Sequence, residues 1–240
     1  MKILIVRHAD PDYSIDSLTP KGHRETELLS KRLTKLDVKE FYVSTLGRAR
    51  VTADYTLNKL NRKPIVCEWL KEFPAVINKP DEQNSITWDW LPKDWTGDDR
   101  FYNISDWLNT PAMLEGNVKE EYTRVVLELD NVIKKHGYER KGRYYKAVNP
   151  NEDTIVFFCH FGVECVLLSH LLGISPMLLW HGFCAAPSSV TTIVTEEREK
   201  GIAYFRVGAF GDISHLYAEN EQPAFAARFC ETYDNFEQRH

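Results

Sequence analysis

Two histidines of this sequence each follow directly after a short apolar run. Arg7 and His8 come after residues 3–6, and His160 comes after residues 154–159. Ligand sites of open α/β sheets form where strands end in loops, so these positions favour chemistry. If the two runs are neighbouring parallel strands, both histidines lie at one edge of the sheet. The first amides of the helix after each strand then point the same way and favour an anion.

A second arginine is predicted to join them from a third strand end. Residues 41–44 are predicted to form a short strand, and Arg48 lies at the start of the helix predicted over residues 47–60. Two arginines and two histidines would then converge on one point. This set suits a phosphoryl group, because its oxygens accept bidentate hydrogen bonds from guanidinium groups and its phosphorus accepts an in-line nucleophile.

Strands that alternate with helices would position these side chains. Thr19 suits the N-cap of a helix and Pro20 suits its first position, so a helix is predicted to start there. The other predicted helices span residues 47–60, 118–135 and 162–172, and the predicted strands span residues 3–6, 41–44, 65–67, 154–159, 190–195 and 203–207. This alternation predicts a three-layer α/β/α sandwich around a mostly parallel central sheet.

The alternation is interrupted between residues 73 and 150. We interpret residues 73–150 as a cap insertion within a single domain that spans residues 1–240. The tryptophans from Trp88 to Trp95 favour a small core of the insertion's own. Because both ends of the insertion lie near the predicted site, some of its side chains are also candidates to contact a substrate. These are Trp88, Trp95, Tyr102, Arg140, Lys141, Arg143, Tyr144, Tyr145 and Lys146.

Composition limits the partners and the compartment. The formal net charge is −5, so no global basic field attracts nucleic acid or an anionic membrane surface. No apolar stretch has the length of a signal-peptide core or of a membrane span. The cysteines are odd in number and form no C-x-x-C pair, which favours a reducing compartment and therefore the cytoplasm. They are Cys67, Cys159, Cys165, Cys184 and Cys230.

Metal-ligand spacing is absent from the sequence. No set of histidine, cysteine, aspartate or glutamate resembles H-E-x-x-H or a paired C-x-x-C. We therefore expect neither a metal nor another cofactor, and we expect a small phosphorylated molecule as the partner. The oligomeric state stays open.

Four segments together resemble the signature of the histidine phosphatase superfamily, also called the phosphoglycerate mutase-like family. They are residues 7–9, 18–22, 44–52 and 159–162, in the order and spacing of that family. The sequence departs from the family pattern at Ala9, where glycine is usual. It departs again at Phe161, because the family usually has Ser-His-Gly-Gly around its second histidine.

The resemblance implies a role for each matching residue. His8 would attack phosphorus and become phosphohistidine, while Arg7, Arg48 and His160 would hold the phosphate. Glu72, in a stretch similar to the family's L-x-E, would donate a proton to the leaving oxygen. Other groups remain open as competing acids or as further site residues, namely Asp10, Asp12, Arg50, His181, His215 and the segment 187–190. Arg48 could instead pair with Asp54.

The expected function is metal-independent hydrolysis of a small-molecule phosphomonoester through a phosphohistidine on His8. Flanking arginines disfavour the imidazolium and keep a ring nitrogen free to attack. An alkoxide leaves poorly, so a proton donor is required. Two rival functions are a phosphoglycerate mutase-type isomerase and a weakly catalytic phospho-ligand binding protein. The sequence disfavours the first, since it has no match to the L-N-E-R-x-Y-G stretch of the mutases.

Overall fold

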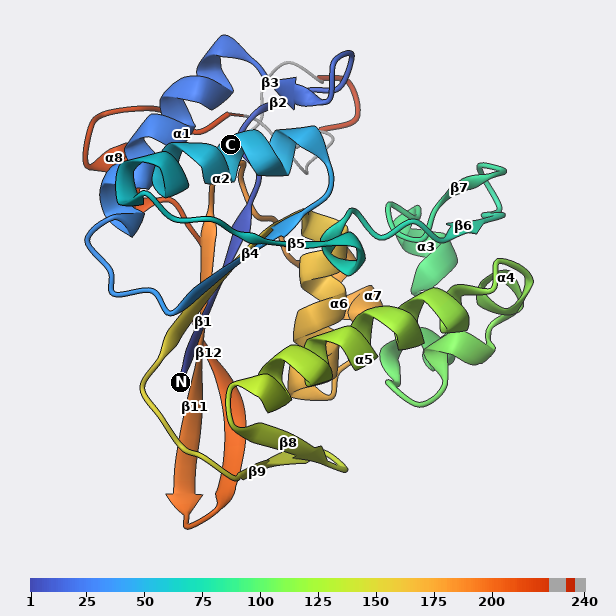
Figure 1. Ribbon diagram of the computed structural model, residues 1–240. Coiled ribbons are helices and arrows are strands. Elements are labelled where there is room, and N and C mark those ends of the chain that lie inside the picture. The colour runs from blue at the N-terminus through green and yellow to red at the C-terminus, as the bar shows by residue number, and fades with distance from the viewer. Residues whose placement is uncertain (225–231, 236–240) are drawn as a thin grey trace.

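A single sheet of eight strands forms the centre of the protein, which a computed structural model describes over residues 1–224 and 232–235 (Figure 1). Cys230 lies outside the described residues. In order across the sheet, the strands are β5 (Ile65–Cys67), β4 (Glu40–Ser44), β10 (Thr154–Cys159), β1 (Lys2–Arg7), β11 (Val190–Glu199), β12 (Ile202–Asp212), β9 (Tyr144–Ala147) and β8 (Tyr138–Lys141).

The sheet is mixed, and the site lies in its parallel half. Strands β5, β4, β10 and β1 run parallel to one another. On the other side of β1, β11 pairs antiparallel with β1, and β12, β9 and β8 follow, each antiparallel to the strand before it. The predicted α/β/α sandwich is therefore confirmed, while the mostly parallel sheet of that prediction holds for one half only. The late strands turn antiparallel because β11 and β12 are joined by a tight turn, and a tight turn cannot join parallel strands.

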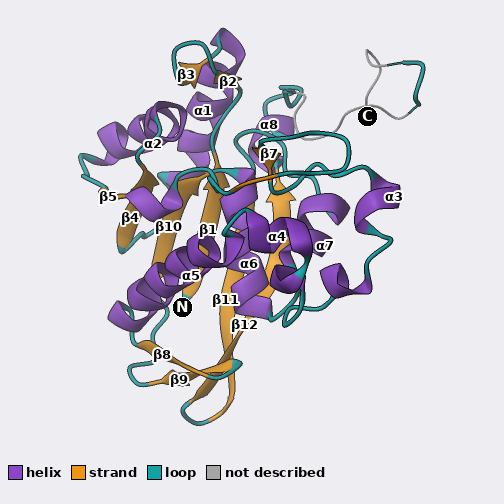
Figure 2. Cartoon of the chain, turned by 90° about the vertical axis from the view of Figure 1, so that its right-hand side faces the viewer, coloured by secondary structure: helices purple, strands orange, loops and turns teal. Residues whose placement is uncertain are grey.

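Helices cover both faces of this sheet, as the alternation of side chains along β1 requires. Leu4 and Val6 face the helices α1 (Pro20–Leu33) and α2 (Gly47–Leu60), whereas Ile3 and Ile5 belong to the larger core on the other face. That second core is formed with α5 (Val118–Lys135) and α6 (Phe161–Leu172). Figure 1 shows α1 and α2 on one side of the strands and α5 and α6 on the other, and Figure 2 looks onto the sheet with α5 and α6 in front of it.

The segment predicted as a cap contributes to two different parts of the molecule. Its second part supplies α5 to the helix layer and β8 and β9 to the main sheet. Its first part forms the short elements gathered beside α5 and α6 in Figure 1. These are β6 (Val76–Ile77), β7 (Ser85–Ile86), α3 (Pro92–Trp95), η2 (Asp99–Tyr102), η3 (Trp107–Asn109) and α4 (Pro111–Glu115). We use the word cap below for residues 73–117 only.

Several short elements complete the chain, and most of them border the site. They are β2 (Pro11–Asp12), β3 (Ser17–Leu18), η1 (Glu68–Leu70), α7 (Pro176–Gly182) and α8 (Ser214–Tyr217). The start of α1 is the predicted one, since the Thr19 hydroxyl accepts a 3.0 Å hydrogen bond from the Gly22 amide and Pro20 is the first helical residue. Among the residues that the structure describes, no helix combines the length and apolar character that a bilayer crossing needs.

Candidate active site

His8 and His160 lie side by side at the carboxyl edge of the sheet. Strands β1 and β10 pair in parallel with Arg7 opposite Cys159, so the residues after them emerge together. The two imidazole ring centroids are 5.0 Å apart, and both side chains are buried. The convergence that the sequence predicts from neighbouring parallel strands is therefore present in the fold.

The hydrogen bonds of His8 fix which of its nitrogens is free. Its Nδ1 lies 2.8 Å from the carbonyl oxygen of Ala9, and a carbonyl only accepts, so Nδ1 carries the proton. The lone pair of the ring is then on Nε2. Burial is the main cause that lowers the pKa of His8 well below its usual value, and the charges of Arg7 and Arg48 lower it further. The ring is therefore neutral and has a free nitrogen near neutral pH.

His160 has the opposite arrangement. Its Nε2 lies 2.9 Å from the hydroxyl oxygen of Ser44, and that oxygen already accepts a hydrogen bond from the Leu46 amide. The hydroxyl proton is free to point at Nε2, which leaves the proton of His160 on Nδ1. Burial, followed by His8 and the two arginines, lowers the pKa of His160 well below its usual value. A neutral His160 can thus donate from Nδ1.

The two arginines come from different elements, Arg7 from the end of β1 and Arg48 from the start of α2. The Arg7 guanidinium donates to the carbonyl of Ala185, and it lies 5.8 Å from the ring centroid of Phe161. Phe161, which departs from the family pattern, thus packs against Arg7. Arg48 pairs with Asp16 at 2.6 Å rather than with Asp54.

Three buried nitrogens at this point have no hydrogen-bond partner within the protein. They are Nε of Arg7, Nε of Arg48 and Nδ1 of His160. Buried donors are normally satisfied, so a cluster of unsatisfied ones needs an explanation. Three donors, two of them cationic, suit an oxyanion with several acceptor oxygens.

Glu72 enters the same region from the end of η1. Its Oε1 accepts from the amides of Phe73 at 3.0 Å and of Val163 at 3.1 Å, which ties it to the first turn of α6. A Cβ added to Gly162 would approach Glu72 Oε1 and the Trp88 ring to 2.6 Å each. Glycine at this position is therefore what lets the acid and the cap reach α6.

Burial raises the pKa of the Glu72 carboxyl, whereas its two amide bonds and the arginines lower it again. The net direction is upward, so the protonated form persists to higher pH than in water. Asp10 and Asp12 are placed differently, because their carboxylates accept from Thr19 and from Ser14 within their own loop. Of the three candidate acids, Glu72 is the one held against α6 beside His160.

Two further groups support the site, and one of them, Asp16, was not singled out from the sequence. Asp16 accepts from Arg48 and from the Gly47 amide, and it does so from a backbone with φ of 46°. Ser188, with φ of 61°, donates its amide to the carbonyl of His8, and its hydroxyl contacts Nε2 of His215 at 3.1 Å. The segment 187–190 therefore lies near the site as predicted, and His215 lies one residue further out.

The other open candidates lie outside this cluster. Arg50 is exposed, while His181 joins α7 to the cap by accepting from the Trp90 amide. Among the cap tryptophans, Trp88, Trp90 and Trp107 are buried in the apolar core. The candidates among residues 140–146 lie on β8, β9 and the turn between them, at the other end of the molecule from α2 in Figure 1, so they do not lie near His8.

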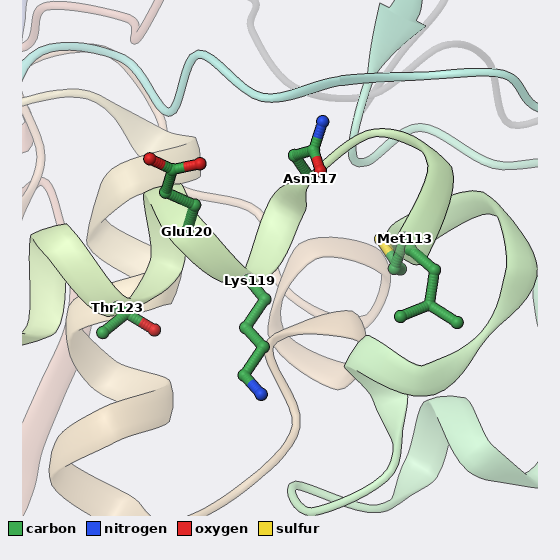
Figure 3. A pocket seen from close by; sticks show the side chains of 6 residues that line it. Met113, Asn117, Lys119, Glu120 and Thr123 are labelled. Atoms are coloured by element: carbon green, nitrogen blue, oxygen red, sulfur yellow. The ribbon is translucent and has the colours of Figure 1, made fainter.

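A surface hollow on the cap side is also separate from the histidines. It lies where α4 meets α5, has a volume of about 460 Å³, and is lined by Met113, Leu114, Asn117, Lys119, Glu120 and Thr123 (Figure 3). None of these residues belongs to the cluster around His8. Among the described parts of the chain, no group of three or more histidine, cysteine, aspartate or glutamate side chains is arranged to hold a metal ion.

Comparison with known proteins agrees with this geometry. A probable phosphatase of Schizosaccharomyces pombe (strain 972 / ATCC 24843) is 25% identical over 234 residues, which cover 91% of this chain and 97% of that protein. A phosphoserine phosphatase mutant from Entamoeba histolytica, solved in complex with phosphoserine, has a TM-score of 0.58 at 17% identity and covers 90% of this chain and 98% of its own.

A mycobacterial glucosyl-3-phosphoglycerate phosphatase, solved with VO3, gives a TM-score of 0.55 at 17% identity, with 87% of this chain and 98% of that chain covered. At these identities the two structures show a shared fold. Residues 3–207 of the sequence match the histidine phosphatase superfamily (branch 1), which is most of the chain. The protein therefore belongs to the histidine phosphatase superfamily, branch 1, and its activity class is that of a phosphatase.

Proposed function

We propose that the protein hydrolyses a small-molecule phosphomonoester in two steps through a phosphohistidine on His8. The observation that carries the proposal is the pairing of a free Nε2 on His8 with unsatisfied donors of Arg7, Arg48 and His160. Without the hydrogen-bond donors, the nucleophile would be repelled by the negative charge of the phosphate. Without the nucleophile, the donors would bind the phosphate but would not react with it. The two solved relatives named above hold phosphoserine and VO3, which is consistent with a small phosphorylated substrate.

In the first step, Nε2 of His8 attacks phosphorus in line with the ester oxygen. The N–P bond forms as the P–O bond to the leaving group breaks. Arg7, Arg48 and His160 hold the equatorial oxygens and stabilise the negative charge that develops on them. Protonated Glu72 gives its proton to the leaving oxygen, so an alcohol departs rather than an alkoxide.

In the second step, the Glu72 carboxylate accepts a proton from a water molecule, whose oxygen attacks the phosphorus of phosphohistidine. The N–P bond breaks, and the electron pair returns to Nε2. Inorganic phosphate leaves, and Glu72 is protonated again for the next cycle. No step needs a metal, because the arginines supply the positive charge, and we propose metal independence on this ground. The cytoplasm remains our proposed location, from the cysteine pattern.

The decisive experiment is His8→Ala with a rapid-quench assay. With substrate labelled on phosphorus, the unchanged protein should yield a phosphoenzyme that survives alkali and is lost in acid, as phosphoramidates are. His8→Ala should give no phosphoenzyme and should lose at least about 1,000-fold in kcat. His23→Ala is the matched control, because His23 lies on α1 outside the cluster.

Two results would contradict the proposal. Turnover that persists in His8→Ala would exclude His8 as the nucleophile. Tight binding of vanadate with no turnover of any aryl phosphate would instead identify a phospho-ligand binding protein.

A further inference from the structure

A short hairpin beside the phosphate pocket exposes two large apolar side chains. Strands β2 and β3 are joined by residues 13–16, and within this turn Tyr13 is 70% exposed and Ile15 is 69% exposed. Exposed apolar side chains are common singly, whereas two that lie within three residues at the edge of a site call for an explanation.

The hairpin is held rigidly against α2. The Asp16 carboxylate accepts from the Gly47 amide and from Arg48, each at 2.6 Å. A Cβ on Gly47 would come within 2.1 Å of the Asp16 carbonyl oxygen, so the backbone of the turn lies directly on the start of the helix. The exposed side chains are therefore presented from a fixed backbone.

The exposed ring of Tyr13 contacts Arg48. Its ring centroid lies 5.3 Å from the Arg48 guanidinium carbon, a cation–π distance. Burial lowers the pKa of Arg7, while Glu72 and then Tyr13 act to raise it, so the phenol also lies within electrostatic range of the second arginine. A phosphoester seated on Arg7 and Arg48 would thus hold its organic part close to this ring.

The aromatic side chains of the cap have less surface available to a substrate. Trp88 and Trp107 are 7% and 0% exposed, and both pack on Trp180. They have no free face for a ligand. Trp95 is stacked on His181 at a centroid distance of 4.9 Å.

We propose that Tyr13 and Ile15 form the contact surface for the organic part of the substrate, and that this part is aromatic or apolar. The proposal rests on the phosphatase function above and adds a substrate class to it. Ring stacking on Tyr13 and apolar contact with Ile15 would favour such esters over small hydrophilic ones.

The test compares esters that share a leaving-group chemistry and differ in apolar surface. Benzyl phosphate and ethyl phosphate both release an alcohol that needs protonation as it leaves, so a difference between them reports binding of the organic part. Tyr13→Ala should lower kcat/KM for benzyl phosphate about tenfold and for ethyl phosphate less than about twofold. Tyr13→Phe should keep the preference, and Ile15→Ser should reduce it in the same direction.

The matched control is Tyr144→Ala, which removes an exposed tyrosine from β9 at the far end of the sheet. It should leave both values unchanged. An equal loss for the two esters in Tyr13→Ala would mean that the ring only supports Arg48, and this would overturn the proposal. A preference for benzyl phosphate that stayed unchanged in Tyr13→Ala would also overturn it.

Binding of benzylphosphonate and methylphosphonate, measured by calorimetry, separates this proposal from the catalytic one. Neither compound can be hydrolysed, so the readout does not depend on turnover. Tighter binding of benzylphosphonate that is lost in Tyr13→Ala supports the surface even if the protein fails to turn over esters. Equal affinity for both phosphonates in the unchanged protein refutes it.

Discussion

His8 and His160 present different nitrogens to the pocket, although both follow strands in the same way. The difference comes from their neighbours. The Ala9 carbonyl accepts a hydrogen bond from Nδ1 of His8, whereas the Ser44 hydroxyl contacts Nε2 of His160. One ring therefore offers a lone pair and the other offers a proton. In the proposed mechanism, one residue type can thus serve as nucleophile and as oxyanion donor, because the hydrogen-bond partner of each ring fixes which nitrogen carries the proton.

The proposed role of Glu72 as proton donor can be tested through the leaving group. Glu72→Gln should slow alkyl phosphates by about 100-fold or more and aryl phosphates much less, because a phenolate needs little protonation. The burst of product in the first turnover isolates this step from the later attack of water. Since the pKa of Glu72 is raised, activity should fall as pH rises through it, and Glu72→Gln should lose that alkaline limb.

Asp10→Asn is the control for that experiment, because its carboxylate accepts from the Thr19 hydroxyl within the loop. It should keep the normal dependence on leaving group. If Asp10→Asn or Asp12→Asn reproduced the loss and Glu72→Gln did not, the proton donor would be assigned to the wrong residue.

How much the sequence predicts differs between residues for a physical reason. His8, His160, Arg7 and Arg48 are placed by strand ends and helix starts, which periodicity reveals. Their supporting partners cannot be predicted in this way, because these partners depend on turns with positive φ and on contacts between distant segments. Asp16 reaches Arg48 across 32 residues of chain, and no local pattern encodes that contact.

At the scale of elements, the long ones follow their patterns closely. The helices predicted over 47–60 and 118–135 and the strand over 154–159 have the predicted bounds. The short helix α7 and the β2–β3 hairpin were not predicted, because their few residues carry no periodicity. Helix α7 nevertheless matters, since Trp180 donates from Nε1 to the carbonyl of Gly162 at 3.0 Å.

Gly162 at the start of α6 gives the prediction that belongs to this scale. Gly162→Ala should push Glu72 and Trp88 away from α6, since its Cβ would meet both at 2.6 Å. A displacement near 1 Å can cost about 100-fold in rate, and we expect a loss of this order in kcat for alkyl phosphates. Steady-state kinetics and a thermal melt measure the activity and the fold separately.

The matched control is Gly182→Ala on α7, where an added Cβ meets nothing within 4 Å. It should leave kinetics and melting temperature close to those of the unchanged protein. Full activity of Gly162→Ala would show that the acid does not need its place against α6.

At the scale of the whole molecule, residues 73–150 do not act as one unit. Helix α5 and strands β8 and β9 complete the main fold, whereas residues 73–117 form a group of short elements beside α5 and α6 (Figure 1). The sequence could not predict this division, because an amphipathic helix packs equally well in a cap or in a core. Aromatic packing on Trp180 and a hydrogen bond to His181 join the cap to α7.

His181 makes that junction sensitive to pH. Its Nδ1 donates to the Met177 carbonyl at 2.7 Å, and its Nε2 accepts from the Trp90 amide at 3.2 Å, so only the neutral ring satisfies both. Burial is the main cause that lowers its pKa to about 4. The unfolded chain would take up this proton near pH 6.5, whereas the folded one resists it, so the stabilisation is complete above pH 6.5.

We therefore expect His181 to cost stability as pH falls from about 6.5 to 4, by about 1.4 kcal/mol per pH unit. His181→Gln removes this titration and keeps both hydrogen bonds, because the amide oxygen can accept from Trp90 and the amide nitrogen can donate to Met177. Urea unfolding at a series of pH values should show nearly equal stability of the two proteins at pH 8. Below pH 6.5 the free energy of unfolding should fall less steeply with pH in the variant, by about 1.4 kcal/mol per pH unit. If the two proteins instead gave parallel curves of unfolding free energy against pH, the cap junction would not titrate through His181.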